Sequence, residues 1–142
     1  MGITQGGVMY EGPDIPDEDI VSIYVIVNGS LGMTPGKIAA QVFHAATNVG
    51  REIERCMWSG TAYGNHGQEF EEYLKQGRRV VVRVAETKGV FMRAWGELGG
   101  FQQIDEGLTQ VDRGSHTCFA TYPIRRGDAP KILSHKRIQL LK

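Results

Sequence analysis

A nearly continuous run of β-branched and aromatic residues, IVSIYVIV at Ile20–Val27, constrains the fold of this chain more than any other feature. It has the length of a β-strand, and its apolar side chains fall on both sides of the strand alternation, which is typical of a central strand. A second run, VVVRV at Val80–Val84, has the same character. Shorter strands are expected at Phe101–Ile104, Cys118–Tyr122 and Arg137–Leu141. These runs predict a layered domain built around a sheet.

Helices are expected between these strands. Thr34 is a favoured N-cap residue and Pro35 a favoured first helical residue, so a helix should begin there and continue to about Met57. Helical patterns also cover Gln68–Gln76, Thr87–Leu98 and, briefly, Ala129–Ser134. Strands that alternate with helices predict an α/β domain. The sheet should be mixed, because some connections are too short for a parallel crossover.

The overall composition excludes several classes of protein. The 142 residues suit one domain, and sixteen basic residues balance sixteen acidic ones, which excludes a uniformly basic nucleic-acid-binding chain. Two cysteines do not suggest a disulfide framework. The chain shows neither a secretory signal nor an apolar run of the ~20 residues that cross a bilayer. We therefore expect a soluble protein of the cytoplasm without a membrane partner.

The charges are distributed unevenly along the chain. Residues 1–20 contain five acidic residues and no lysine or arginine, whereas residues 113–142 contain seven basic residues and one acidic residue. Residues 1–19, rich in Gly, Pro and Asp, should form a flexible acidic lead-in to a domain over residues 20–142. The basic end could form a phosphate-binding face, although a solvated surface with segregated charges would give the same pattern.

Lys37 lies in the first turn of the first expected helix, after a loop that contains glycine. A phosphate-binding P-loop would need glycine at Leu31 and Ser or Thr at Ile38, so a nucleoside triphosphatase is excluded. A lysine at a helix N-terminus is unfavourable for the helix dipole and needs another reason to be there. We favour anion binding at this helix start over a merely solvated lysine.

Three polar residues, Lys37, Gln41 and His44, form a stripe along this helix. From the residues alone, Gln41 could equally be a buried side chain that bonds a nearby loop, and for His44 a hydrogen-bonded core histidine is favoured over catalysis. The four histidines are scattered and neither cysteine has a partner at ligand spacing, so no metal site is expected. Cys118 is expected to be a small core residue.

A second candidate site lies between two expected strands. Asp105 ends one strand and Thr117 begins the next, and the loop between them carries the hydroxyls of Thr109 and Ser115. Neighbouring strand ends could bring a carboxylate and a hydroxyl together to orient and deprotonate a water. The same residues are also ordinary turn formers, which is the alternative interpretation.

Four segments of the chain, in order, resemble the archaeal and eukaryotic type of peptidyl-tRNA hydrolase. GMTPGKIAAQVFHAA is similar to the family's Gly-Lys-Ile-Ala-Ala-Gln run followed by His-Ala, and YLKQGRRVVVRV to its Lys-Val-Val strand region. IDEGLTQVDRGSHTCFATYP resembles its Asp-Ala-Gly-x-Thr-Gln segment, and RIQLLK its Leu-Lys-Leu-Leu ending. The resemblance extends from about Ile20 to Lys142.

The resemblance implies a compact α/β domain with a four-stranded mixed sheet, for which we expect helices on both faces, and an enzyme that is often a homodimer. It implies hydrolysis of the ester between a peptide and the 3′ end of tRNA, which recycles tRNA from stalled translation, with no metal or cofactor. Asp105 and Thr117 would position or activate a water, and Lys37 would hold the tRNA end or the developing oxyanion. The implied catalytic residues are Lys37, Gln41, Asp105 and Thr117, with Thr109, Ser115 and His44 lining the site.

The chain departs from the family pattern in ways that bear on RNA binding. Family lysines in the first loop fall on Gly32 and Pro35, and Leu108 replaces a common arginine. Because phosphate contacts supply much of the affinity for RNA, other basic residues should compensate. The candidates are Arg79, Arg83, Arg113, Arg125 and Arg126. Two other functions are compatible with the pattern: a catalytically inactive relative that binds RNA or a protein, and a small-molecule hydrolase.

Overall fold

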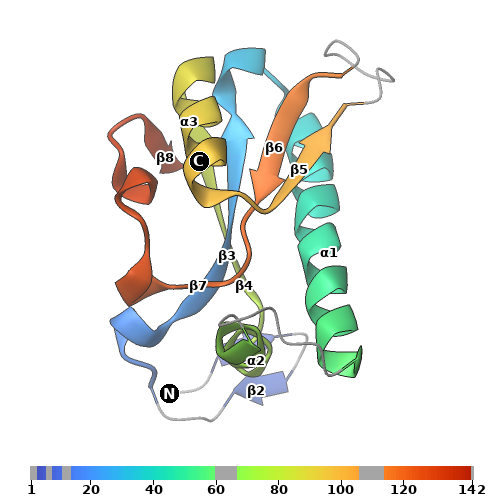
Figure 1. The fold of residues 1–142 in the computed structure, drawn as a ribbon, viewed down its shortest axis with the longest axis vertical. Helices are drawn as coiled ribbons and strands as arrows, with labels where there is room; N and C mark the ends of the chain where they lie inside the picture. The colour runs from blue at the N-terminus through green and yellow to red at the C-terminus, as the bar shows by residue number, and fades with distance from the viewer. Residues whose placement is uncertain (1–2, 6–7, 11–13, 60–66, 106–113, 142) are drawn as a thin grey trace.

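A computed structural model describes residues 3–5, 8–10, 14–59, 67–105 and 114–141. Within these ranges the chain is an α/β protein (Figure 1). Its α-helices are α1 (Pro35–Ser59), α2 (Gly67–Lys75) and α3 (Lys88–Leu98). The strands of the main sheet are β3 (Val21–Asn28), β4 (Arg79–Ala85), β5 (Phe101–Ile104), β6 (His116–Ala120), β7 (Ile124–Arg125) and β8 (Ile138–Leu140). A separate antiparallel pair joins β1 (Ile3–Gln5) to β2 (Val8–Tyr10).

Short 3-10 helices connect several of these elements. They are η1 (Asp17–Asp19), η2 (Gly29–Leu31), η4 (Arg126–Asp128) and η5 (Lys131–Ser134). The short helix expected at Ala129–Ser134 is therefore the 3-10 helix η5. In the described part of the chain, no helix has the length and apolar character needed to cross a membrane.

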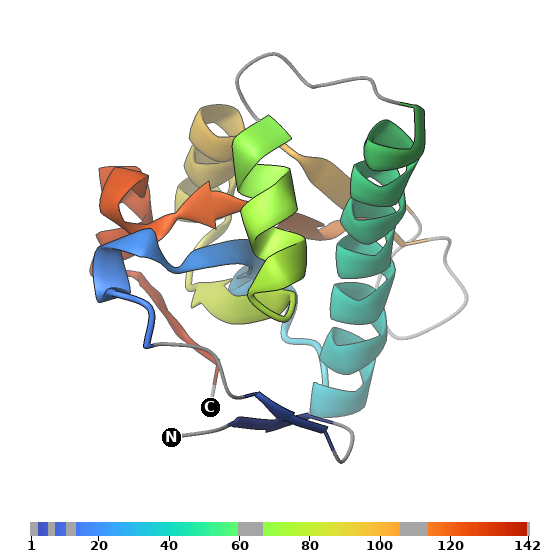
Figure 2. The ribbon, with the colours of Figure 1, turned by 90° about the horizontal axis from the view of Figure 1, so that it is seen from below.

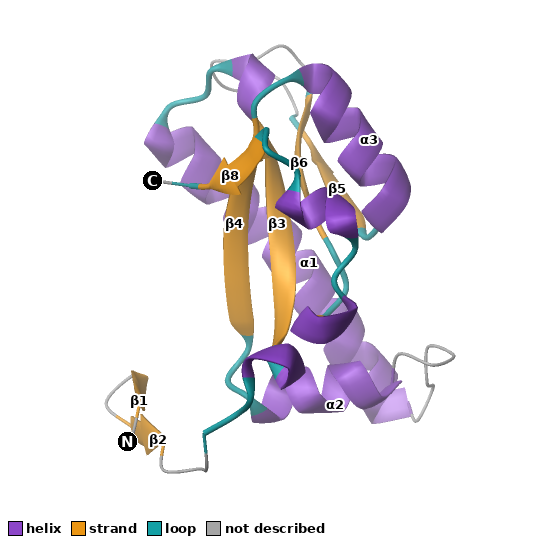
Figure 3. Cartoon of the chain, turned by 90° about the vertical axis from the view of Figure 1, so that its left-hand side faces the viewer, coloured by secondary structure: helices purple, strands orange, loops and turns teal. Residues whose placement is uncertain are grey.

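The main sheet is mixed and has the strand order β5-β6-β3-β4-β8 (Figure 3). β3 and β4 are parallel from Ser22↔Arg79 to Asn28↔Ala85, and the other pairs are antiparallel. β7 pairs with the first two residues of β3, in addition to the pairing of β6 farther along that strand. The expected count of four strands is wrong, because the described residues form a sheet of six. The strand expected at Arg137–Leu141 is confirmed as β8, whereas β7, with two residues, was not predicted.

β3 is the buried centre of the sheet, and all eight of its residues are buried. The run of β-branched residues that predicted a central strand is therefore confirmed. Its residues divide between two hydrophobic clusters in alternation, as a strand with two covered sides requires. One cluster joins residues of β3 to α1 and α2, including Val21, Ile23, Val25, Val27, Ala45, Val49, Ile53 and Phe70. The other joins residues of β3 to α3 and η5, including Tyr24, Ile26, Phe91, Ala94, Ile132 and Leu133.

The expected helices are confirmed to within about two residues at their ends. The Thr34 hydroxyl accepts a hydrogen bond from the N–H of Lys37 at 3.3 Å, as an N-cap residue does. Thr87 caps α3 in the same way, through the N–H of Val90 at 3.2 Å. α2 lies beside the C-terminal half of α1 (Figures 1 and 2), and Phe70 and Tyr73 of α2 join the same cluster as Ile53.

Candidate active site

Lys37 and Asp105 form a buried ion pair between α1 and the residue that follows β5. The ammonium Nζ of Lys37 contacts the carboxylate Oδ2 of Asp105, and the two side chains are only 9% and 2% exposed. A buried charge needs a partner of opposite sign, and the carboxylate also offsets the unfavourable position of a cation at a helix N-terminus. The pair joins two segments that lie 68 residues apart.

Both main-chain polar groups of Asp105, the N–H and the carbonyl, are hydrogen-bonded to the start of the β6 segment. Its N–H donates to the carbonyl of Ser115 at 2.9 Å, and its carbonyl accepts from the N–H of Gly114 at 2.7 Å. These bonds close the end of the β5–β6 pair immediately before Thr117. The carboxylate is therefore fixed to the strand that carries the Thr117 hydroxyl.

A bulge in β6 turns the Thr117 side chain toward α1. The pairing of β5 with β6 passes from Gln103↔Cys118 directly to Ile104↔His116, so Thr117 has no partner on β5. An extra residue of this kind lets two successive side chains face the same side of a sheet. Both Thr117 and Cys118 contact Gln41 of α1: the Thr117 hydroxyl contacts its amide, and the Cys118 Sγ lies 3.4 Å from its carbonyl.

Gln41 and Thr117 form the second contact between α1 and the sheet in this site. The Thr117 hydroxyl donates to Oε1 of Gln41 at 2.8 Å and also lies 3.0 Å from the carbonyl of Gln103. One hydroxyl proton can serve only one of these acceptors at a time. An amide turned by 180° would fill the same space and donate from Nε2, which would leave the hydroxyl proton to Gln103. The Gln41 amide can therefore orient the hydroxyl in either of two ways.

Asn28 and Gln103 also contact this site, and neither was predicted from the sequence. Asn28 ends β3 and donates from Nδ2 to the carbonyl of His116 at 3.1 Å. Gln103 takes part through its main-chain carbonyl, which no sequence pattern marks. The sequence did carry a signal for Asn28, because it is a polar residue at the end of an apolar strand. The structure shows that this residue is buried.

The remaining candidate residues of the site differ in their surroundings. His44 is exposed and contacts the Phe43 ring edge-on at 6.1 Å, so the interpretation as a core histidine is wrong. The pattern misled because His44 lies about 100° around the helix from the buried Ala45, on the side of Lys37 that faces away from the core. Ser115 is half-buried and bonds Asp105 through its carbonyl. Thr109 lies outside the described residues.

Cys118 is a fully buried core residue, as expected. Burial raises the pKa of its thiol to about 12, and the neighbouring Thr117 lowers it only in part. Only the thiolate form of cysteine is a good nucleophile, so the protonated Cys118 thiol is not a nucleophile at neutral pH. Within the described ranges, no group of three or more His, Cys, Asp or Glu side chains could hold a metal ion.

The four candidate RNA-binding arginines that the structure describes do not gather around Lys37 and Asp105. Arg79 is exposed at the start of β4, and Arg83 is half-buried farther along that strand. Arg125 lies 3.5 Å from Asp19, and Arg126 lies 4.0 Å from Asp17. β7 pairs with the first residues of β3, whereas the bulge follows its last residues, about 20 Å away at ~3.3 Å per residue. Arg113 lies outside the described residues.

Comparison with known proteins agrees with the resemblance seen in the sequence. The family described as Peptidyl-tRNA hydrolase PTH2 matches residues 21–138. A protein named peptidyl-tRNA hydrolase from Thermoplasma volcanium is 29% identical, over 73% of this chain and 86% of its own length. Proteins of the same name from Methanopyrus kandleri and Thermococcus onnurineus are 26% and 24% identical, over 89% and 93% of their lengths. Because the family match spans most of the chain, this protein belongs to the PTH2 family of peptidyl-tRNA hydrolases.

Proposed function

We propose that this chain hydrolyses the ester between a peptide, or an N-blocked amino acid, and the 3′ end of tRNA. We assign the chemistry to Lys37, Gln41, Asp105 and Thr117. One observation carries this assignment: four residues from three separate segments form two adjacent contacts, Lys37 with Asp105 and Gln41 with Thr117. A protein that only binds RNA has no need for a buried ion pair beside a bonded hydroxyl.

The roles follow from the chemistry of these groups. The Asp105 carboxylate accepts a hydrogen bond from a water and takes its proton as the water attacks the ester carbonyl. The Thr117 hydroxyl, oriented by Gln41, holds that water in line. An ammonium carries three N–H donors, so Lys37 can bond Asp105 and still donate to the oxyanion that develops on the ester oxygen. The proton then passes from Asp105 to the departing 3′ oxygen of the tRNA.

Several further features belong to the same proposal. Arg79, Arg83, Arg113, Arg125 and Arg126 are proposed to contact RNA phosphates; of those that the structure describes, Arg79 and Arg126 are exposed. The helices are proposed to cover both faces of the sheet, which the alternation of β3 residues between two clusters supports. A homodimeric state and a role in the rescue of stalled ribosomes are proposed on the family resemblance alone, and action in the cytoplasm on that resemblance together with the composition of the chain.

The test is release of free tRNA from N-acetyl-aminoacyl-tRNA by the wild type and by Asp105→Asn. We expect Asp105→Asn to lower kcat by at least about 100-fold, because it removes the general base. Asp128→Asn is the matched control, since Asp128 is exposed on η4 and far from the ion pair. Thermal unfolding of each variant shows that the protein tested is folded.

Three outcomes separate the candidate functions. Cleavage lost in Asp105→Asn and kept in Asp128→Asn supports the hydrolase. A folded wild type that binds tRNA without cleaving it would instead indicate an inactive binding relative. Cleavage of simple esters that is insensitive to salt, with none of tRNA esters, would indicate a small-molecule hydrolase.

A further inference from the structure

The side chain of Asn28 connects the two halves of the candidate active site. It is 4% exposed and ends β3, the central strand. Its Nδ2 donates to the carbonyl of His116 at 3.1 Å. Its Oδ1 accepts from the N–H of Ser30 at 3.2 Å and from the hydroxyl of Ser30 at 2.6 Å. One amide thus bonds both to the strand of Thr117 and to the loop that leads into α1.

The Asn28 amide acts at the point where main-chain pairing stops. The ladder between β3 and β6 covers Val25, Ile26 and Val27, and its last pair is Val27↔Cys118. The bulge at Thr117 interrupts the regular strand geometry just beyond that pair. The Asn28 side chain reaches past that last pair to the carbonyl of His116, the residue before Thr117. It therefore attaches β6 to β3 next to the residue that the shift in the β5–β6 pairing leaves without a partner.

The loop that bonds Oδ1 of Asn28, which contains Gly29 and Ser30, packs closely on β4. Gly29 packs so closely on β4 that a Cβ there would lie 2.7 Å from the carbonyl of Ala85. Asn28 itself pairs with Ala85 in the parallel β3–β4 ladder. The loop bonded by Oδ1 is therefore fixed to the sheet, and it continues through Met33 into the first turn of α1, which carries Lys37.

We propose that Asn28 is a positioning residue for the hydrolysis: its amide fixes the bulged Thr117 relative to Lys37 and Asp105. This inference rests on the proposed function. The role requires a donor on one side and an acceptor on the other, which asparagine supplies and aspartate does not. Aspartate at this position would keep the bonds from Ser30 and would turn a second oxygen toward the His116 carbonyl.

The test compares Asn28→Asp with Ser30→Ala in the tRNA-release assay, below the unfolding temperature of each variant. We expect Asn28→Asp to lower kcat roughly tenfold with KM changed less than about twofold, because a buried carbonyl loses its donor while the RNA surface stays intact. Ser30→Ala removes one of the two bonds to Oδ1 and leaves the bond to His116, so it should lower kcat less than Asn28→Asp does.

A second measurement does not depend on activity. The N–H of Asp105 bonds Ser115 and the N–H of Gly114 bonds Asp105, so both report on the strand start that Asn28 holds. In Asn28→Asp, hydrogen exchange at these two amides should accelerate, while exchange in the β3–β4 ladder stays as in the wild type. If Asn28→Asp only lowered the stability of the fold as a whole, hydrogen exchange would accelerate throughout the sheet.

A double-mutant cycle with Thr117→Val completes the test. If Asn28 acts through the Thr117 hydroxyl, Asn28→Asp should have little further effect on kcat once that hydroxyl is gone. Effects that simply multiply, or unchanged exchange at Asp105 and Gly114, would overturn the inference while leaving the hydrolase assignment in place. An unchanged kcat in Thr117→Val would instead overturn the proposed catalytic set, and the role of Asn28 with it.

Discussion

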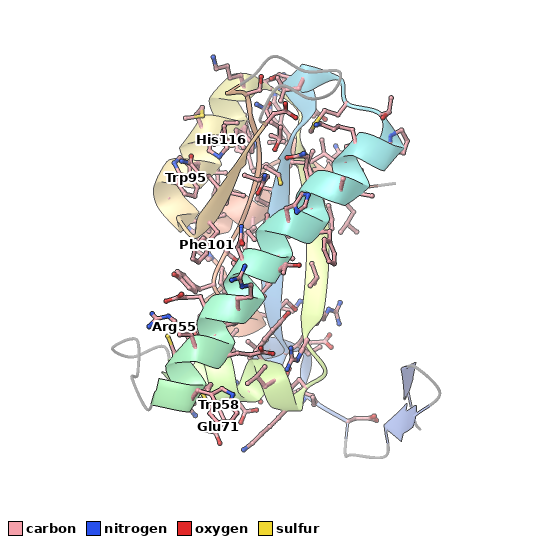
Figure 4. The ribbon with its side chains drawn as sticks, turned by 90° about the vertical axis from the view of Figure 1, so that its right-hand side faces the viewer. Arg55, Trp58, Glu71, Trp95, Phe101 and His116 are labelled. Atoms are coloured by element: carbon pink, nitrogen blue, oxygen red, sulfur yellow. The ribbon has the colours of Figure 1, made fainter. Side chains whose placement is uncertain are left out.

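His116 precedes Thr117 in the sequence but faces the other side of the sheet from the candidate active site. Its ring contacts Phe91 edge-on at 4.8 Å and lies 6.5 Å from Phe119. It also contacts Trp95 edge-on at 5.4 Å (Figure 4). Nε2 is buried and has no hydrogen-bond partner among the described residues. Burial in this setting lowers the pKa of the imidazole, because the charged form is poorly solvated.

This histidine should make the folded state less stable in acid. Since its folded pKa lies below the ordinary value of 6.5, the unfolded chain binds more protons as the pH falls through that value, and the free energy of unfolding decreases. We expect His116→Phe, which keeps a ring in the aromatic contact, to lose less thermal stability than the wild type between about pH 7.5 and about pH 5. His44→Gln is the control, because His44 is exposed. Equal losses in wild type and His116→Phe would contradict the prediction.

At the scale of elements, the turn between α3 and β5 depends on two glycines. Gly99 and Gly100 both have positive φ, at 62° and 108°. At Gly100 a Cβ would also lie 2.0 Å from the carbonyl of Ala120, so the turn packs directly on the end of β6. The turn fixes the position of Phe101, at the start of β5. It therefore also determines the position of Asp105, which follows the last residue of this strand.

Substitution of Gly100 should therefore disrupt the sheet edge. We expect Gly100→Ala to lower the free energy of unfolding by about 2–4 kcal/mol, through the clash and the left-handed backbone together. Gly96→Ala is the matched control: Gly96 is exposed inside α3, and nothing lies within 4 Å of the place that a Cβ would occupy. Alanine there should stabilise the fold by about 0.5–1 kcal/mol. Urea unfolding measures both, and similar effects of the two substitutions would refute this role of the turn.

At the scale of the whole molecule, acidic and basic segments distant in sequence meet. Asp17 and Asp19 of η1 lie beside Arg126 and Arg125, and Gln76 donates to the carbonyl of Asp19 at 3.1 Å. These ion pairs are long and weak, and their carboxylate side chains are 50% and 83% exposed, so RNA phosphates could displace the carboxylates. In the absence of RNA, however, the acidic residues reduce the positive charge of Arg125 and Arg126. Arg79 is not among the ion pairs of the described residues.

Arg79 should consequently contribute more to RNA affinity than its paired counterparts. We expect Arg79→Ala to raise KM for the tRNA ester about fivefold at low salt and to reduce the salt dependence of log KM by about one unit of slope. The value of kcat should be unchanged. The control is Arg55→Ala, since Arg55 is exposed on α1 and paired with Glu52. Equal KM values for the wild type and Arg79→Ala would contradict the prediction that Arg79 binds RNA.

The sequence by itself determined the central strands, the three helices, the Thr34 cap of the first helix, and the family. These properties are encoded locally, because burial on both faces of β3, the Thr34 cap and the family segments can each be read within a few adjacent residues. For the same reason Lys37, Gln41, Asp105 and Thr117 could be named as candidates before any contact was known. Their catalytic roles stay a prediction.

Only the tertiary structure decided how these residues meet. Three contacts of the site join segments that are 68 to 88 residues apart in the sequence. They are the contact of Thr117 with Gln41, the bond from Asn28 to His116 and the ion pair of Lys37 with Asp105. The two-residue strand β7, which no sequence pattern predicted, likewise exists only through its pairing with β3. Such contacts depend on strand register and on the direction in which a helix crosses the sheet, and a one-residue change in register would turn every side chain to the opposite face.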